Sequence, residues 1–197
     1  PFATVLTCGT GSFSEDQTCM SEKFFRAGTA SNPKGGVAII GPSDLHTSTK
    51  YNNVINAYMF DAMLDDGIVE LGPAVNAGLL GLTREFPNLD GPEEAQEFYF
   101  HVYNILGDPS VSIHLTKPHE FSITTEECSA GDGFIELLVF DENGSPIENA
   151  NVSLMANDSI IFKGNTDTYG QIDASITLGD ISIIDVYVNK NGFIQGH

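Results

Sequence analysis

The stretch "FATVLTCGTGSFSEDQTCMSEKFFRAG", residues 2–28, holds the elements that decide the fold. It begins with an apolar run at 2–6, which is typical of a buried strand. A glycine-rich turn containing Cys8 follows this run. Ser14 and Gln17 then fit a capping box, which predicts the start of a helix. The order of strand, turn and helix indicates an α/β domain.

The first 115 residues continue this alternation. "GGVAII" at 35–40 is an uninterrupted apolar run, as expected of a parallel strand covered on both faces. Alternating residues at 111–115 predict a third strand. Apolar residues recur at helical spacing in three further segments, 51–63, 75–86 and 98–106. We therefore expect the runs at 2–6 and 37–40 to be adjacent parallel strands of a three-layer domain.

The predicted helices outnumber the predicted strands. In a doubly wound sheet, strands and helices alternate one for one. A sheet with only three strands is too small to cover the apolar faces of the four predicted helices. The first strand also has no parallel partner before it in this sequence. The pattern therefore predicts further strands upstream of Pro1.

The pattern changes after the short linker "TKPHE" at 116–120. Helical spacing gives way to evenly spaced alternating runs, separated by turn clusters such as "DENGSP". The runs are 121–124, 133–140, 151–155, 159–164, 172–177 and 181–188. Short strands at this spacing predict a β-sandwich. We place the domain boundary between residues 1–117 and 118–197.

The charge of the chain restricts its partners. The 197 residues include 27 acids and 8 Lys and Arg, a formal net charge of −19. Such a surface repels nucleic acid and anionic membranes, and its simplest role is solubility. No apolar run is long enough to be a transmembrane segment, and no signal peptide is visible.

The three cysteines show no spacing that is typical of a metal site. Cys8 follows a strand in a glycine-rich turn, where a nucleophile could reach a ligand at the sheet edge. From the spacing alone, a buried strand-end thiol is the simpler interpretation. Cys19 lies on the predicted apolar helical stripe and is interpreted as core packing. Cys128, in "EECSAGDG", is interpreted as a loop thiol.

Three collinear segments carry a family resemblance. They are "TCGTGSFSEDQTCMSEKFFRAG" at 7–28, "GGVAIIGPSDLHTSTKYNN" at 35–53 and "YNILGDPSVSIHL" at 103–115. Together they resemble the C-terminal half of the catalytic domain of gingipain-like cysteine peptidases. The β-rich tail resembles the immunoglobulin-like module that follows such domains. The resemblance implies part of a caspase-like three-layer αβα domain with a mostly parallel sheet, followed by an all-β immunoglobulin-like sandwich.

The resemblance also implies a catalytic role for Cys8. In this family a cysteine and a histidine form a dyad, and the cysteine matches Cys8. Its backbone amide would help to bind the oxyanion. The family's histidine lies upstream in a His-Gly turn that this sequence lacks. None of the five histidines is carried over as the base: His46, His101, His114, His119 and His197. We therefore expect this segment alone to lack the catalytic base.

The loop after the second strand corresponds to a wall of the family's substrate pocket. Asp44 could accept a basic substrate side chain, but an aspartate that caps a turn is an equally good interpretation. Arginine- and lysine-specific members place an aromatic residue here. This loop offers His46 and Tyr51 instead, and the chain has no Trp. Basic-residue specificity is therefore not carried over, while Asp44 and His46 stay candidate substrate-binding residues.

No cofactor is required by the chemistry that the resemblance implies. Acidic pairs at 65–66, 93–94 and 126–127 could hold calcium, but no Asp-x-Asp-x-Asp pattern supports such a site. The pairs are more simply helix caps or solvated faces.

Three functions fit these observations. The first is a secreted or cell-surface cysteine endopeptidase that cleaves protein or peptide substrates together with the upstream remainder of the same protein. The second is a sortase-like processing peptidase of a bacterial secretion system, which would use the same cysteine. The third is a non-catalytic surface or adhesin module of the same fold. A His-Gly turn upstream of Cys8 would favour the two catalytic functions.

Overall fold

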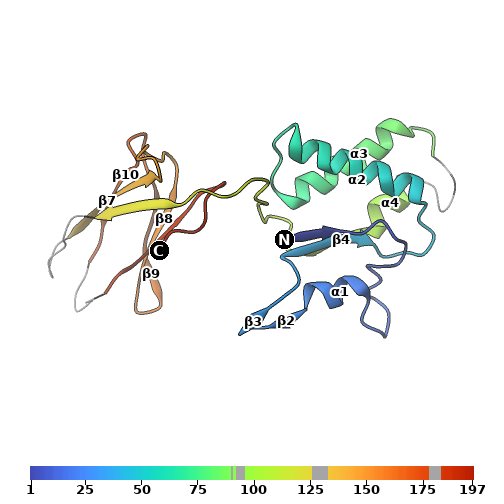
Figure 1. Cartoon of the computed structure of the whole chain (residues 1–197), viewed down its shortest axis with the longest axis horizontal. Helices are drawn as coiled ribbons and strands as arrows, with labels where there is room; N and C mark the ends of the chain where they lie inside the picture. Colours follow the sequence, from blue (N-terminus) through green and yellow to red (C-terminus); the bar gives the residue numbers. More distant parts are fainter. Residues whose placement is uncertain (90, 92–95, 126–132, 178–182) are drawn as a thin grey trace. The chain divides into compact units, whose positions relative to one another are not determined.

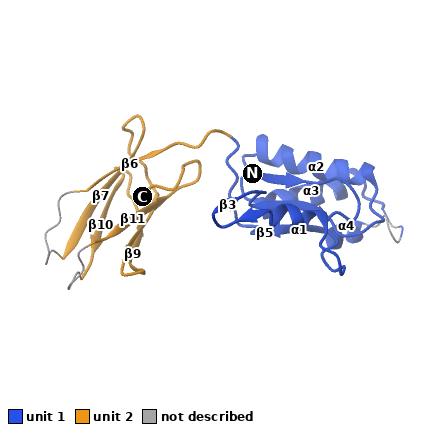
Figure 2. Ribbon diagram, turned by 60° about the horizontal axis from the view of Figure 1, so that its bottom comes forward, with its two compact units in different colours: residues 1–115 blue, residues 116–197 orange. Residues whose placement is uncertain are grey.

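The computed structural model describes residues 1–89, 91, 96–125, 133–177 and 183–197. These residues form two compact units, Pro1–Leu115 and Thr116–His197 (Figure 2). Each unit has a hydrophobic core of its own, and the two sets of described core residues have no member in common.

A three-stranded sheet lies at the centre of the first unit, with the strands in the order β1-β4-β5. Strand β1 (Phe2–Thr4) runs parallel to β4 (Ala38–Pro42), which confirms that the two apolar runs are adjacent and parallel. Strand β5 (Tyr103–Gly107) is antiparallel to β4. The expected mostly parallel sheet is thus not seen among these strands, because one of the two pairings is antiparallel.

Helices cover both faces of this sheet (Figure 1). Helix α1 (Met20–Phe25) packs against β4 and β5. On the opposite face lie α2 (Thr49–Leu64) and α3 (Leu71–Glu85), with the short α4 (Gln96–Val102) leading into β5. A small hairpin of β2 (Gly28–Thr29) and β3 (Asn32–Pro33) joins α1 to β4.

The core of the first unit lies between the sheet and the pair α2–α3. Ile55, Met59 and Met63 of α2 are buried at the predicted helical spacing, as are Leu79 and Leu82 of α3. The axes of these helices come close because α3 presents glycines to α2. A Cβ atom on Gly78 would lie 2.5 Å from the carbonyl oxygen of Ile55. The predicted helices over 51–63 and 75–86 are confirmed.

Two sequence-based boundaries in this unit were wrong. The third strand is not at 111–115, where Ser112 makes only an isolated bridge to Glu70, but at Tyr103–Gly107. Leu106 fits the spacing of the preceding helix, yet its backbone pairs with β4 opposite Ile39. Pairing with a buried strand overrode the helical periodicity there. The proposed helix start at Pro92 lies outside the described residues.

The first helix also begins later than predicted. It starts at Met20, not after Ser14, and Cys19 is its N-cap. The backbone N–H of Cys19 donates to Glu22 Oε2 at 2.9 Å, so Glu22 takes the part that the sequence assigned to Gln17. Met20 and Phe25 are largely exposed, and the predicted apolar stripe is therefore wrong. Cys19 is half-buried at the helix start and is not a core residue.

The second unit consists of two three-stranded antiparallel sheets around one core. One has the order β10-β7-β6 and the other β11-β8-β9. The strands are β6 (Phe121–Thr125), β7 (Phe134–Asp141), β8 (Asn151–Ala156), β9 (Ser159–Asn165), β10 (Gln171–Ser175) and β11 (Asp185–Asn189). Alternate residues of β7 and β8 point into the shared core. The described residues of this unit contain no helix. The first five predicted strands are confirmed; of the sixth, predicted at 181–188, residues 181–182 lie outside the described residues and the observed strand begins at Asp185.

Candidate active site

Cys8 lies just beyond the carboxyl end of β1. The N–H of Val5 still donates to the carbonyl of Ile40, at 2.8 Å, and the chain then leaves the sheet. At Gly9 the backbone takes a left-handed conformation, with φ of +66°, which glycine adopts without strain. The residue Cys8 is half-buried, and it lies at the edge of the sheet where the sequence placed it.

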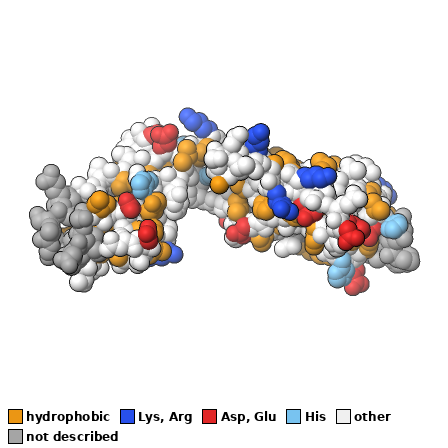
Figure 3. All heavy atoms as spheres, turned by 90° about the horizontal axis from the view of Figure 1, so that it is seen from below, with side chains coloured by type: hydrophobic (Ala, Val, Ile, Leu, Met, Phe, Trp, Pro, Cys, Tyr) orange, Lys and Arg blue, Asp and Glu red, His pale blue; other side chains and the backbone are white. Residues whose placement is uncertain are grey.

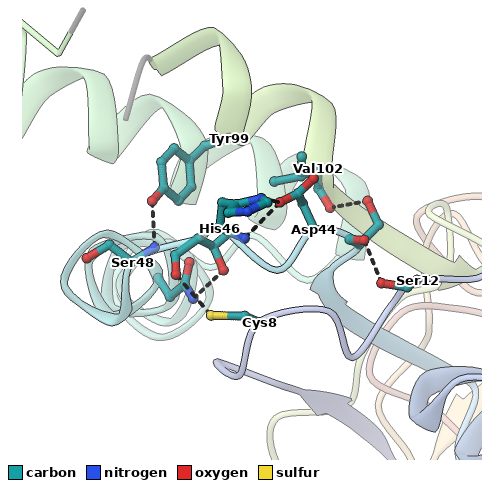
Figure 4. Close-up of polar contacts among 10 residues, drawn as sticks. Cys8, Ser12, Asp44, His46, Ser48, Tyr99 and Val102 are labelled. Carbon is teal, nitrogen blue, oxygen red and sulfur yellow. Dashed lines mark hydrogen bonds and ion pairs between the residues drawn. The ribbon is translucent and has the colours of Figure 1, made fainter. Parts of the chain in front are cut away.

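The turn that carries Cys8 is bound to the loop that follows β4. Gly9 N–H donates to the carbonyl of Asp44 at 2.8 Å, and Gly11 N–H donates to that of Pro42 at 2.9 Å. The Cys8 thiol donates to the carbonyl of Thr47 at 2.9 Å (Figure 4). Strands β1 and β4 run in the same direction, and their following loops therefore meet at one edge of the sheet.

A groove of about 720 Å³ opens between these two loops. One wall is formed by Gly9, Ser12 and residues 15–19, and the other by residues 43–46. Asp44 and His46 both line it, and so does Cys19, for which the sequence had predicted a core position. The structure therefore brings both candidate substrate-binding residues to a groove next to the turn that carries Cys8.

Asp44 and His46 interact with each other. Asp44 Oδ1 accepts the backbone N–H of His46 at 2.8 Å and lies 2.9 Å from His46 Nδ1. The hydrogen bond from the His46 backbone is the main cause that lowers the pKa of Asp44, and it outweighs the opposing effect of burial. In Figure 4 the His46 ring points toward Asp44, away from the sulfur of Cys8. Asp44 thus has the local turn contact that the sequence offered as the alternative to substrate binding.

Most of the other histidines also lie beside carboxylates. His101 pairs with Glu97, His119 with Glu142 and His197 with Asp185. The bond of the Cys8 thiol within the described residues is to a backbone carbonyl.

Two buried tyrosines lie behind the site. The hydroxyl of Tyr99, which is fully buried, accepts the backbone N–H of Ser48 at 2.9 Å and so holds the loop after β4 (Figure 4). Burial raises the pKa of Tyr103, and the nearby Tyr99 and Cys8 raise it further when ionised. Tyr103 therefore stays neutral and lies within electrostatic reach of Cys8.

The sequence had indicated Tyr99 only as a residue of the apolar helix face, and it had given no role at the site to Tyr99 or to Asn52. Asn52 is fully buried in the first turns of α2 and makes hydrogen bonds to both loops. Its place was readable, since it lies three residues before the buried Ile55 on the same face of the helix. A polar residue on the apolar face of a helix needs a hydrogen-bonding partner, and this requirement is the signal that could have found it.

Metal ligands, long apolar helices and basic side chains are the other features of the described residues that bear on function. No group of three or more His, Cys, Asp or Glu side chains in that part of the chain is arranged to hold a metal ion. None of its helices is long and apolar enough to cross a membrane. Lys and Arg side chains are few and scattered on the face in Figure 3. Cys128 and the acidic pairs at 93–94 and 126–127 lie outside the described residues.

The fold and the site together define a class of protein. Cysteine hydrolases can carry their nucleophile in such a place, in a loop at the carboxyl edge of an α/β sheet beside a groove. The model of peptidase family C25 matches residues 1–114, which is more than half of the chain. The chain belongs to this family. No curated protein matches the sequence.

Solved structures with the same fold include gingipain R. The Arg-specific cysteine proteinase gingipain R (RgpB) superposes with a TM-score of 0.71 at 17% identity, over 100% of this chain and 44% of that one. A complex of the pro- and mature domains of Porphyromonas gingivalis RgpB gives 0.70 at 16% identity, over 98% and 44%. A third, described only as a protease, gives 0.69 at 16%, over 99% and 45%. The chain thus spans less than half the length of these structures.

Proposed function

We propose that this chain is the nucleophile-bearing part of a gingipain-like cysteine endopeptidase. The observation that carries the proposal is the half-buried Cys8 thiol, at the edge of the sheet beside a groove, in a chain of peptidase family C25. The substrate is a protein or peptide whose backbone lies along the groove. The gingipain R likeness supports the fold of both units, including a caspase-like arrangement of the first and an immunoglobulin-like arrangement of the second.

In the proposed reaction the Cys8 sulfur attacks the carbonyl carbon of the scissile peptide bond. A histidine upstream of this segment in the complete protein takes the thiol proton and passes it to the leaving amine. The backbone amide of Cys8 helps to bind the oxyanion. Water then hydrolyses the thioester and regenerates the thiol. The hydrogen bond from the thiol to the Thr47 carbonyl exists only while Cys8 is protonated, because the thiol is the donor. This bond must therefore break before the sulfur can attack.

Asp44 and His46 are proposed to contact the substrate from the second wall of the groove. Each is partly exposed there, with side-chain exposures of 37% and 60%. Their mutual bond limits what Asp44 can offer to a basic side chain, which is why no residue preference is assigned. A secreted or cell-surface location completes the proposal.

Two alternatives keep the same fold. A sortase-like processing peptidase would use Cys8 on protein sorting signals, and a non-catalytic surface module would not use it at all. The half-buried thiol beside the groove favours a catalytic protein, because a structural thiol would point into the helix layer and be fully buried.

Hydrolysis of a mixed peptide library by the complete protein tests the proposal. We expect Cys8→Ala to reduce the rate by about a thousandfold or more with unchanged thermal stability. Cys19→Ala is the control, since Cys19 is a second half-buried cysteine and lines the groove beside the turn of Cys8, and this variant should retain most of the activity. Undiminished hydrolysis by the Cys8 variant would leave the non-catalytic module as the better account.

A further inference from the structure

A buried asparagine joins the two loops that meet at Cys8. The Nδ2 group of Asn52 donates to the carbonyl of Leu6 at 2.9 Å and to Thr47 Oγ1 at 3.2 Å. Leu6 belongs to the segment that leads into Cys8, and the Thr47 carbonyl accepts the Cys8 thiol. A single side-chain amide therefore holds both the segment that carries the thiol and the residue to which the thiol is bound.

The chemistry of the partners fixes the orientation of this amide. The Leu6 carbonyl can only accept a hydrogen bond, so the NH₂ group of Asn52 must face it. A flipped amide would place Oδ1 against the Leu6 oxygen and would repel it. In the observed orientation Asn52 Oδ1 is buried and has no hydrogen-bond partner within the described structure. An unpaired buried acceptor destabilises the fold, and so Asn52 is a poor choice for helix packing alone.

We propose that Asn52 is a positioning residue for the Cys8 thiol. It keeps the end of the β1 segment and the loop after β4 in register, so that the sulfur stays between them. Thr47, which is also buried, transmits this restraint through its hydroxyl group to the carbonyl that the thiol contacts. The effect on peptide hydrolysis rests on the proposed function, whereas the effect on the thiol itself does not.

Site-specific alkylation measures the restraint directly. Iodoacetamide is added to the chain in a Cys128→Ser background, and the modification of each remaining cysteine is followed by peptide mass spectrometry. Without Asn52 the thiol should leave its bond to Thr47 more readily. We expect Asn52→Ala to raise the alkylation rate of Cys8 about threefold to tenfold, the range of a modest hydrogen bond. The alkylation rate of Cys19 in the same molecule should not change.

Asn56→Ala is the matched control on the same helix. Asn56 Oδ1 accepts a hydrogen bond from Thr4 Oγ1 at 2.9 Å, on β1 itself and away from the thiol. The Asn56 variant should therefore leave the alkylation rate of Cys8 at the wild-type value. A rise equal to that of Asn52→Ala would show a general loosening of α2 against the sheet and would overturn the proposal.

A second pair of variants tests the route through Thr47. Thr47→Val removes the hydroxyl group at constant shape and should raise the Cys8 alkylation rate. Thr47→Ser keeps a hydroxyl group and should leave this rate at the wild-type value. In the double variant Asn52→Ala/Thr47→Val, the Cys8 alkylation rate should rise by less than the product of the two single increases. The reason is that both substitutions remove the same hydrogen bond, from Asn52 Nδ2 to Thr47 Oγ1. An unchanged Cys8 rate in Asn52→Ala and Thr47→Val, or a parallel rise at Cys19, would refute the proposal.

The same variants separate this proposal from the proposed function. If the complete protein hydrolyses peptides, Asn52→Ala should lower kcat and leave KM nearly unchanged, since the groove walls persist. If it hydrolyses none while the alkylation rates respond as expected, the positioning role stands and the peptidase function fails.

Discussion

Gly9→Ala is the substitution whose cost can be worked out most directly at this site. Gly9 has φ of +66°, and a side chain in this left-handed region costs about 1–2 kcal/mol. The new Cβ would also lie 2.5 Å from Leu45 Cδ2. Leu45 is 73% exposed and can rotate away, so this contact should add little. We therefore expect a loss of about 1–2 kcal/mol in the free energy of unfolding of the first unit.

Gly67→Ala provides the matched control for this cost. Gly67 has nearly the same φ, +69°, but a Cβ there would meet nothing within 4 Å. Both variants should lose a similar amount of the free energy of unfolding. Any difference between the two losses measures the contact of the new Cβ with Leu45. Only Gly9→Ala should also change the alkylation rate of Cys8, because Gly9 binds the loop after β4.

Urea unfolding followed by helical circular dichroism is the appropriate assay, since all described helices belong to the first unit. A Gly9→Ala variant as stable as the wild type would refute the left-handed turn and the loop contact built on it. If Gly9→Ala loses far more free energy of unfolding than Gly67→Ala, Leu45 cannot rotate away from the new Cβ. The groove wall that contains Leu45 is then more rigid than the exposure of this side chain implies.

Two further predictions concern the cores and the pH dependence. Leu82→Ala and Leu137→Ala, at fully buried positions in the first and second units, should each cost about 2–5 kcal/mol, and differential scanning calorimetry should show each change in a different transition. One shared transition lowered equally by both would contradict independent cores. Because the pKa of Asp44 is lowered from 3.8, its stabilising effect is present above that pH and is lost as the pH falls through the lowered pKa. Asp44→Asn should therefore reduce stability at neutral pH, with the deficit vanishing in acid; a deficit that persists in acid would exclude the contact with His46 as its cause.

The elements that could be predicted from the sequence are those with one regular pattern of burial along their whole length. All residues of β4 are buried, so an uninterrupted apolar run was a sufficient signal. The strands of the second unit were found for a related reason, because alternation in β7 reports one buried face. Strand β5 was missed because Leu106 also fits the preceding helix, and only its pairing with β4 decides between the two structures.

The candidate site was predicted in position but not in detail. Cys8 and the loop of Asp44 and His46 could be placed together, since the carboxyl ends of parallel neighbours share an edge. The bond of Asn52 to Leu6, across 46 positions of sequence, could not be read from any local pattern. Cys19 was misplaced for a local reason: its backbone N–H is bound to Glu22, which fixes it at the helix start.

Covalent labelling by a peptide inhibitor tests the central claim most directly. A peptidyl acyloxymethyl ketone reacts with the nucleophile of a cysteine peptidase, and mass spectrometry of the labelled complete protein identifies the residue. We predict one label per molecule, on Cys8, with loss of peptide hydrolysis in proportion to labelling. A label on Cys19 or Cys128 that abolishes hydrolysis, or full hydrolysis with Cys8 completely labelled, would contradict Cys8 as the nucleophile.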